Sequence, residues 1–213
     1  ITPATGTWIS APSLTVAGEI TEENLDEITI GGVVAQLSGN AFTAEVPLTT
    51  EGSISLTVLA KDLATNESSH SIVVHRDATL PIINVTSISD GTVTNVASHL
   101  LEGQVIETNL ESFTIDGSVV TVAQDGTFAH QMTFSSGTQT ITLVARDQAQ
   151  NETTETLSIV LDDQAPVLVV TQPTGEFTKL SAITVAGTAQ DERLSTVTVN
   201  GTEAVLQGSN FSI

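Results

Sequence analysis

The sequence predicts an all-β protein built of tandem antiparallel β-sandwiches, and three observations support this fold class. Apolar residues make up 39% of the chain, whereas aromatic residues make up 3% and charged residues 14%. Much of the remainder is polar and rich in Thr, and Thr, Val and Ile fit a pleated strand better than a helix because they are stiff at χ1. A long motif is repeated along the chain, and within each repeat short alternating segments are separated by turn residues. The apolar content excludes a disordered chain.

The internal repeat has a period of 85 residues. Residues 61–67, Lys-Asp-Leu-Ala-Thr-Asn-Glu, reappear at 146–152 as Arg-Asp-Gln-Ala-Gln-Asn-Glu. A third copy starts after Pro166, and Gly18, Gly103 and Gly187 occupy equivalent positions. This period is too long for a solenoid unit and fits a whole small β-sandwich. We therefore predict three repeats, the first clipped at its start and the third truncated before its last two strands, as in a piece of a longer array, at 1–77, 82–162 and 167–213.

The second repeat shows the pattern of strands most clearly. Asp116-Gly117 lies between two alternating segments, which is a strong hairpin signal. Short strands with turns every 8–12 residues are typical of an immunoglobulin-like sandwich, and no segment has a helical period. The strands are expected at 82–88 (an edge strand), 99–106, 113–115, 119–123, 127–134, 139–145 and 153–161. The buried face is predicted to consist of Leu101, Val105, Phe113, Ile115, Phe128, Ile141, Leu143, Leu157 and Ile159.

Charge and composition exclude several function classes. Five Lys and Arg residues stand against 25 Asp and Glu residues, a net charge of −20. Binding to nucleic-acid phosphates needs clustered basic residues and is excluded, and contact with anionic lipid is disfavoured. The chain has no Cys, so disulfides, thiol nucleophiles and Cys-based zinc sites are absent. The sequence has no membrane-spanning apolar segment and no signal-peptide pattern in residues 1–20. Without an HExxH, a G-x-S-x-G or a phosphate-binding glycine loop, we expect no enzyme.

The order of the motifs resembles a known type of module. Each full repeat passes from a strand through Asp-x-Ala-x-Asn into another strand and ends in Asp-x-x-x-Pro. Over essentially the whole chain this order resembles the tandem bacterial immunoglobulin-like (BIg-type) repeats of large surface adhesins. It is also similar to β-sandwich modules attached to secreted polysaccharide-degrading enzymes. The chain departs from the usual turn in having Thr65 and Gln150 where glycine is common, and it lacks the Cys…Trp…Cys pattern of antibody domains.

Acidic residues recur where one repeat joins the next. In an immunoglobulin topology, the linker that leaves one sandwich meets the B–C and F–G loops of the following one. Converging carboxylates repel one another unless a cation lies between them, and Ca²⁺ takes six to eight oxygen ligands. We therefore hypothesise that calcium binds at the junctions, and the resemblance to adhesin repeats implies the same. The candidate ligands are Asp77, Glu107, Asp147 and Asn151 at the first junction and Asp162, Asp163 and Asp191 at the second.

A plainer interpretation of the same residues stays open. Asp62 and Asp147 could accept hydrogen bonds from the backbone of their own turns, as Asp commonly does. Pro81 and Pro166 would stiffen the linkers without any metal. In a chain this acidic, carboxylates also fall near the junctions by chance.

Two functions follow from these features. In the first, the repeats are a non-catalytic stalk or extender of an exported bacterial surface protein, found at the cell surface or outside the cell. Their partners are then neighbouring repeats of the same chain, with no nucleic acid and no membrane contact. The alternative is an accessory or carbohydrate-binding module of a secreted polysaccharide-degrading enzyme. Sugars stack on exposed aromatic rings, and the chain has one tryptophan, Trp8, and no tyrosine; a buried Trp8 would favour the stalk.

Overall fold

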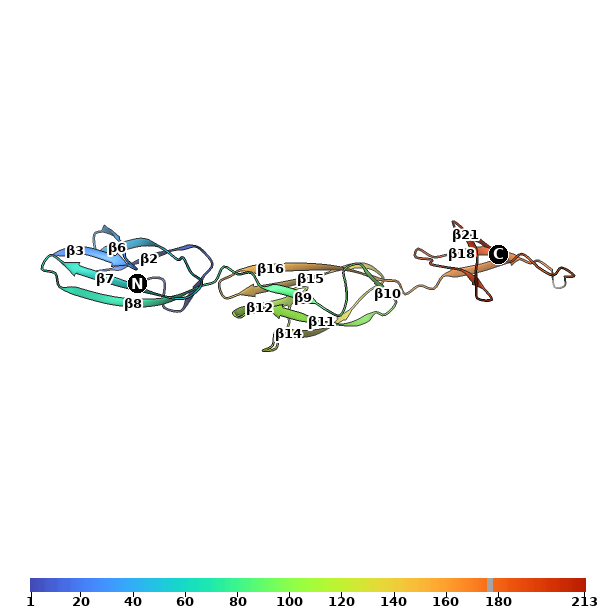
Figure 1. Cartoon of the computed structure of the whole chain (residues 1–213), viewed down its shortest axis with the longest axis horizontal. Coiled ribbons are helices and arrows are strands. Elements are labelled where there is room, and N and C mark those ends of the chain that lie inside the picture. The colour runs from blue at the N-terminus through green and yellow to red at the C-terminus, as the bar shows by residue number, and fades with distance from the viewer. Residues whose placement is uncertain (176–177) are drawn as a thin grey trace. The chain divides into compact units, whose positions relative to one another are not determined.

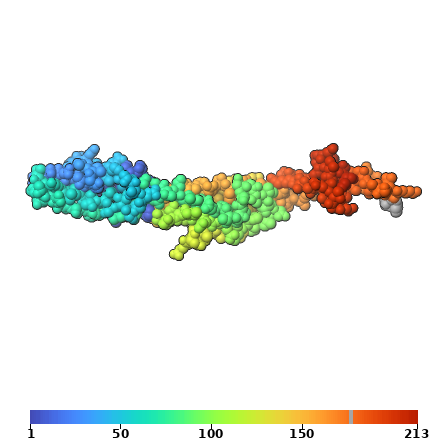
Figure 2. Space-filling model, in the orientation of Figure 1, coloured from blue at the N-terminus to red at the C-terminus, as the bar shows by residue number. Residues whose placement is uncertain are grey.

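The computed structural model describes residues 1–175 and 178–213, and every regular element in them is a β-strand. Figure 1 shows the strands as arrows along the chain, and Figure 2 shows the same residues as atoms in the same colours. No helix in the described residues is long and apolar enough to cross a membrane. The predicted all-β fold class is confirmed. We name three repeats by the boundaries predicted from the sequence, 1–77, 82–162 and 167–213, which stay predictions.

The first repeat is a pair of sheets around one apolar core, antiparallel except that β1 pairs with β8 in parallel. One sheet has the strand order β1-β8-β7-β3-β4 and the other β2-β6-β5. Strand β6 shows how the sequence directs packing, because Phe42, Ala44 and Val46 are buried while the residues between them are exposed, as the two-residue period of a strand requires. The strands are β1 (Thr7–Ile9), β2 (Ser13–Glu19), β3 (Leu25–Ile30), β4 (Val33–Val34), β5 (Gln36–Ser38), β6 (Ala41–Pro47), β7 (Gly52–Asp62) and β8 (Glu67–Arg76).

The second repeat has a corresponding larger sheet, β10-β16-β15-β12-β13, and a smaller sheet of order β14-β11-β9, in which β9 flanks β11 on the side that is an open edge in β2. The side chains predicted to be buried are buried, except that Leu157 is half-buried. Phe113 and Phe128 from the two sheets contact each other with ring centroids 4.7 Å apart. The strands are β9 (Ile82–Val85), β10 (Thr92–Thr94), β11 (Ser98–Ile106), β12 (Leu110–Ile115), β13 (Ser118–Val119), β14 (Thr127–Thr133), β15 (Gly137–Asp147) and β16 (Glu152–Leu161).

Two strands of the second repeat are shorter than predicted. The expected strand 82–88 ends at Val85, because the N–H groups of Thr86 and Ser87 both donate to the carbonyl of Glu102 and the regular ladder stops there. The expected strand 119–123 is reduced to Ser118–Val119. After this strand the chain turns inward, and Val120 becomes buried while its N–H donates to the carbonyl of Phe113.

The third repeat contains shorter strands and a smaller core. Its sheets have the orders β17-β18-β22-β21 and β19-β20. Its buried cluster consists of Ala189, Val197, Ala204 and Phe211. The strands are β17 (Val167–Gln172), β18 (Ala186–Gln190), β19 (Thr198–Val199), β20 (Thr202–Glu203), β21 (Val205–Gln207) and β22 (Asn210–Ser212).

The described chain divides into two compact units. The first comprises residues 1–92, 98–132 and 139–159, and the second comprises residues 93–97, 133–138 and 160–213. The first-junction residues described below all lie in the first unit, and the second-junction residues all lie in the second.

We expect residues 167–213 to be the first part of the chain cut in limited proteolysis. Their buried cluster is small, and β17 leaves Val167, Leu168, Val169 and Val170 at least half exposed. A segment with few buried apolar contacts opens locally at low free energy and so becomes accessible to a protease. Mass spectrometry of fragments after short digestion in dilute solution checks this. Resistance equal to that of residues 82–162 would contradict it.

A glycine stacked under a phenylalanine ring recurs in all three repeats. The ring carbons of Phe42, Phe128 and Phe211 lie 2.5, 2.7 and 2.8 Å from where a Cβ on the facing glycine would stand. The facing glycines are Gly18, Gly103 and Gly187, the positions that the sequence repeat aligns. A ring from the neighbouring strand thus approaches each glycine closely, and at Gly103 and Gly187 a backbone carbonyl lies nearer still, 2.2 and 2.0 Å from where a Cβ would stand.

Candidate metal centre

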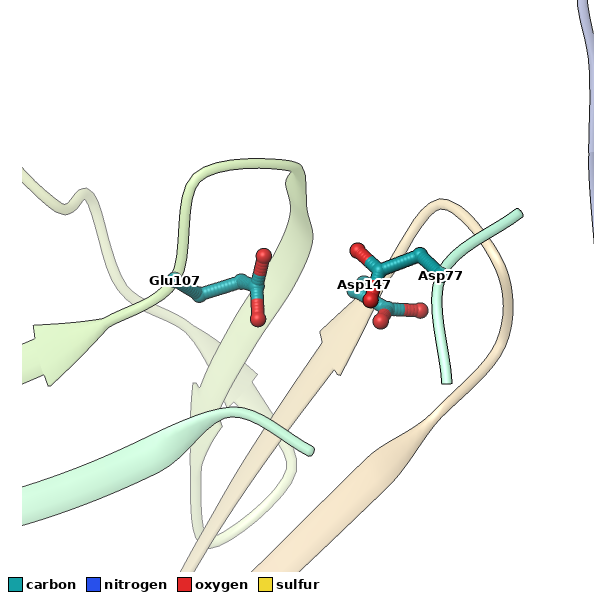
Figure 3. Close-up of side chains that lie close together, drawn as sticks. All are labelled: Asp77, Glu107 and Asp147. Atoms are coloured by element: carbon teal, nitrogen blue, oxygen red, sulfur yellow. The ribbon is translucent and has the colours of Figure 1, made fainter. Parts of the chain in front are cut away.

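The structure brings together three carboxylates of the first junction. Asp77 follows β8, Glu107 follows β11 and Asp147 is the last residue of β15. One carboxylate oxygen from each lies within 4.8 Å of the others. Figure 3 shows the two aspartates side by side, with the carboxylate of Glu107 pointing toward them. In the described residues this is the only group of three or more His, Asp or Glu side chains that lie so close together.

Asp147 is held by the turn that it begins. One carboxylate oxygen accepts the backbone N–H of Asn151 at 2.8 Å, and the other accepts Nδ2 of Asn151 at 2.7 Å. The backbone N–H of Asp147 donates to the carbonyl of Asn151, closing the turn. Gln150 has a φ of 67° and Thr65 in the first repeat a φ of 68°. Both turns thus place a non-glycine residue in the left-handed region, at the positions where the sequence departs from the usual glycine.

Asp77 and Glu107 are oriented by their own local hydrogen bonds. The backbone N–H of Asn109 donates to Glu107 at 2.8 Å, and the N–H of Thr79 donates to Asp77 at 3.0 Å. Nδ2 of Asn109 reaches the second oxygen of Asp77 at 3.2 Å. Nδ2 of Asn151 also donates to the carbonyl of Asp77 at 2.8 Å. Hydrogen bonds within the protein therefore bring the three segments of the site together without a metal ion.

The donor set fits calcium. Asp147 is fully buried and Asp77 is 8% exposed, and the ion pairs found among the described residues involve none of the three carboxylates. Ca²⁺ binds oxygen at about 2.3–2.6 Å, so two ligands on opposite sides of the ion are about 4.6–5.2 Å apart. The carboxylate oxygens lie within 4.8 Å of one another, close enough for all three to bind one such ion. Each hydrogen-bonded oxygen keeps a second lone pair that could face a cation.

The other predicted ligands have different surroundings. Asn151 lies at the site, but its amide nitrogen donates both to Asp147 and to the carbonyl of Asp77. At the second junction, Asp162 faces the guanidinium of Arg193 at 3.9 Å. Asp191 accepts the backbone N–H of Arg193 at 2.6 Å. Asp163 accepts hydrogen bonds from Ser136 and Gln164, and these bonds, that of Ser136 first, lower the pKa of its carboxyl group.

Sequence analysis missed one residue of the centre, Asn109. It connects Glu107 to Asp77 through its backbone and side-chain nitrogens. The repeat contained a usable signal, because Asn24 occupies the equivalent position in the first repeat and Arg193 in the third. The position therefore carries a donor toward the linker aspartate in both junctions, an amide in one and a guanidinium in the other.

We expect the pKa of Asp62 to lie below the ordinary aspartate value of about 3.9. The side-chain hydrogen bond from Asn66, followed by that from the Asn66 backbone, lowers it. Because the folded pKa is below the unfolded one, the stabilisation is present above the unfolded pKa and is lost as the pH falls through the folded value. NMR titration of the carboxyl carbon checks this. Asn66→Ala should move the pKa upward, and an unchanged pKa in that variant would contradict the assignment.

Comparison with known proteins identifies the family. The model of the family described as glucodextranase, domain B, matches residues 1–78, 81–163 and 166–213. The chain belongs to this family. A relative, bacillopeptidase F from Bacillus subtilis (strain 168), is 28% identical over 171 residues, which are 78% of this chain. The chain spans 12% of the length of that relative.

A solved structure supports the fold of this glucodextranase domain B chain. A titin I67–I69 variant with three immunoglobulin domains has a TM-score of 0.55 at 14% identity, covering 99% of this chain and 84% of that one. Fibronectin(III)-like modules of CbhA from Clostridium thermocellum have a TM-score of 0.48 at 14% identity, covering 75% and 91%. The titin likeness and the family match show tandem immunoglobulin-like β-domains, which is the coarser part of the resemblance noted in the sequence.

Proposed function

We propose that this chain is a non-catalytic spacer in an exported bacterial surface protein of the adhesin type. Its repeats would hold a distal binding module away from the cell, and calcium at Asp77, Glu107 and Asp147 would stiffen the linker between the first two repeats. The neighbouring repeats of the same chain are its direct partners. The proposal sets the chain at the cell surface or outside the cell.

The linker between the first two repeats carries this proposal. Residues 77–81 are bonded at both ends by the second repeat, while Ala78 and Thr79 between them donate to Glu51 of the first repeat. Asn109 and Asn151 donate to the side chain and carbonyl of Asp77, and the hydroxyl of Thr153 donates to the carbonyl of Pro81 at 2.5 Å. A linker with these bonds and a proline has lost most of the freedom of a flexible tether. Such restriction suits a module whose task is to keep its ends apart.

Calcium would make the stiffness of the same linker depend on the Ca²⁺ concentration. Three carboxylates in a partly buried site repel one another, and a divalent cation would offset this repulsion and join the linker to two loops. The second junction has its own positive charge, because Arg193 faces Asp162. We therefore propose calcium binding at the first junction. The predicted ligands Asp162, Asp163 and Asp191 are weaker candidates, because Arg193 already supplies a positive charge beside Asp162.

Calorimetry on the full chain tests the calcium proposal. We expect Ca²⁺ to bind with measurable heat and to raise the melting temperature of the second repeat. Glu107→Gln should abolish both effects, because it removes one of three charges without removing the acceptor for the N–H of Asn109. Glu22→Gln is the matched control, since Glu22 accepts the N–H of Asn24 in the first repeat in the same way. Equal Ca²⁺ binding by the wild type and the Glu107→Gln variant would refute the site.

The spacer role has its own readout, which does not depend on calcium. Small-angle scattering should give a narrow distribution of maximum dimension for the chain. Replacing Thr153 and Asn109 by alanine, which removes linker hydrogen bonds, should broaden it. If the distribution were already that of freely jointed domains in the wild type, the spacer role would fail whether or not calcium binds.

A second candidate function keeps some support. The family takes its description from a domain of glucodextranase, which agrees with an accessory module of a polysaccharide-degrading enzyme. Trp8 is half-buried, and its ring stacks on His75 with centroids 4.6 Å apart, so one face is already covered. Affinity electrophoresis with soluble glucans separates the two functions. Retardation that is lost in Trp8→Ala would favour the accessory module.

A further inference from the structure

The end of the first repeat that carries the turn between β7 and β8 duplicates the loops of the metal centre. In the first repeat, Asp62 accepts the N–H and Nδ2 of Asn66 at 2.8 and 2.7 Å, the same two distances as between Asp147 and Asn151. Glu22 accepts the N–H of Asn24 at 3.0 Å, as Glu107 accepts that of Asn109. The N–H of Leu63 donates to the carbonyl of Asn24, as that of Gln148 donates to Asn109. We call this end, residues 20–25 and 60–68, the first-repeat apex.

The two ends differ in what covers them. In the second repeat, the linker 77–81 lies on the loops and accepts hydrogen bonds from Asn109, Asn151 and Thr153. The equivalent residues of the first-repeat apex are Asn24, Asn66 and Ser68, and all three are exposed. Asp147 is fully buried, whereas its equivalent Asp62 is only half-buried. The donors that hold a linker in the second repeat are therefore present and uncovered in the first.

A cavity lies at the first-repeat apex, where the second repeat has its linker. It has a volume of about 240 Å³ and is lined by both loops of the first-repeat apex, including Glu22, Leu25, Asp62, Asn66 and Ser68. In the second repeat the residues equivalent to Asp62, Asn66 and Ser68 face or bond the linker. The space has the location that a linker like residues 77–81 would occupy.

The adjoining sheet has an open edge at the same end. Strand β2 lies at the edge of its sheet, whereas the equivalent β11 and β18 are flanked by β9 and β17. A Cβ on Gly103 or Gly187 would meet a carbonyl of the flanking strand at 2.2 or 2.0 Å, whereas the three atoms nearest to a Cβ on Gly18 all belong to the ring of Phe42. On this edge of β2 a single isolated bridge joins Ala17 to Thr2. An added strand could pair with the remainder of the edge.

We infer that the first-repeat apex is a docking site for an extended acidic segment in which Asp stands four residues before Pro and a β-strand follows. The Asp would accept from Asn24 and Asn66, the residue at the proline would accept from Ser68, and the strand would add to β2. This is the chemistry of the linkers of this family, since Asp77…Pro81 and Asp162…Pro166 precede the other two repeats. The occupant is thus a linker of the same kind together with the strand that follows it. The inference does not rest on calcium, because it uses amide, hydroxyl and backbone donors.

The test is a full chain extended at its N-terminus by the sequence of residues 77–85. Under the repeat, Ile1 is equivalent to Thr86, so the added Asp is in register with the first-repeat apex. Hydrogen exchange is followed by NMR in the presence of a chelator. Glu19 and Thr21 are equivalent to Gln104 and Ile106, which pair with Asn84 and Ile82 of β9, so their N–H groups are the ones that an added strand would cover. We expect these two amides to exchange at least about tenfold more slowly in the extended chain, as for closure of an open edge.

Matched variants separate docking from non-specific protection. Asn24→Ala in the extended chain should weaken the protection several-fold, because a charge-assisted hydrogen bond to the added Asp is lost. Asn109→Ala is the control, since it alters the same position of the second repeat and should leave Glu19 and Thr21 unchanged. Random-coil shifts for the extension, or equal protection by an extension with a shuffled sequence, would overturn the inference. Protection that needs added Ca²⁺ would also overturn it in its present form.

Discussion

Gly103→Ala is expected to destabilise the second repeat by about 3 kcal/mol, the upper end of the usual range for overpacking. A Cβ on Gly103 would lie 2.2 Å from the carbonyl oxygen of Asn84 and 2.7 Å from the ring of Phe128. The ring could turn aside, but the carbonyl belongs to β9, which pairs with β11 from Gly103 to Ile106. The methyl group therefore forces two strands apart, and a change of rotamer cannot relieve the clash.

Gly18→Ala is the matched control for this prediction. There the three atoms nearest to a Cβ all belong to the ring of Phe42, the first of them at 2.5 Å. A side chain can yield where a strand cannot, so we expect a loss of about 1 kcal/mol. Urea denaturation followed repeat by repeat by NMR measures both, because a chain of several domains does not unfold in one transition. Equal losses in the two variants would show that the ring contact, and not the flanking strand, sets the requirement for glycine.

These glycines show how much of the fold could be predicted from the sequence. Their equivalence was visible from the repeat, and the alternation of apolar residues predicted the buried faces of β11, β12 and β15. What the pattern did not reveal was the reason for glycine, since Phe128 stands far from Gly103 in the sequence and only pairing of β11 with its neighbours brings them together. Non-local pairing also explains the missed strand β10 (Thr92–Thr94), which has no alternation of its own to indicate it.

The candidate site was predictable to a similar extent. Topology alone was enough to bring the first-junction acids to one end of a sandwich. The turn interpretation and the metal hypothesis both survive, because Asp147 accepts two hydrogen bonds from Asn151 and also lies beside Asp77 and Glu107. Asn109 and Arg193 were not predicted, because a donor that reaches across a junction is recognised only when both partners are placed.

Asp147→Ala is expected to have the second large effect, a loss of about 3 kcal/mol in the second repeat without calcium. Asp147 is fully buried, and its removal leaves the N–H of Asn151 without its acceptor and Nδ2 of Asn151 with only the carbonyl of Asp77. Hydrogen bonds to charged groups contribute about 1.5–3 kcal/mol each, and an unsatisfied buried donor costs a comparable amount. Part of this loss is offset, because the variant also removes one of three mutually repelling carboxylates.

Measuring the stability of Asp147→Ala with and without calcium distinguishes the metal hypothesis from the turn-forming interpretation. If the centre binds Ca²⁺, the ion stabilises only the wild type, so the difference between wild type and Asp147→Ala should grow with Ca²⁺ concentration. Asp147→Asn sharpens the comparison, since its amide oxygen can still accept the N–H of Asn151 while the charge is gone. It should be milder than Asp147→Ala in chelator and equally insensitive to calcium. Asp62→Ala is the control, because the first-repeat turn has the same hydrogen bonds without the third carboxylate. A loss in Asp147→Ala that is the same with and without Ca²⁺ would leave Asp147 with the turn-forming role alone.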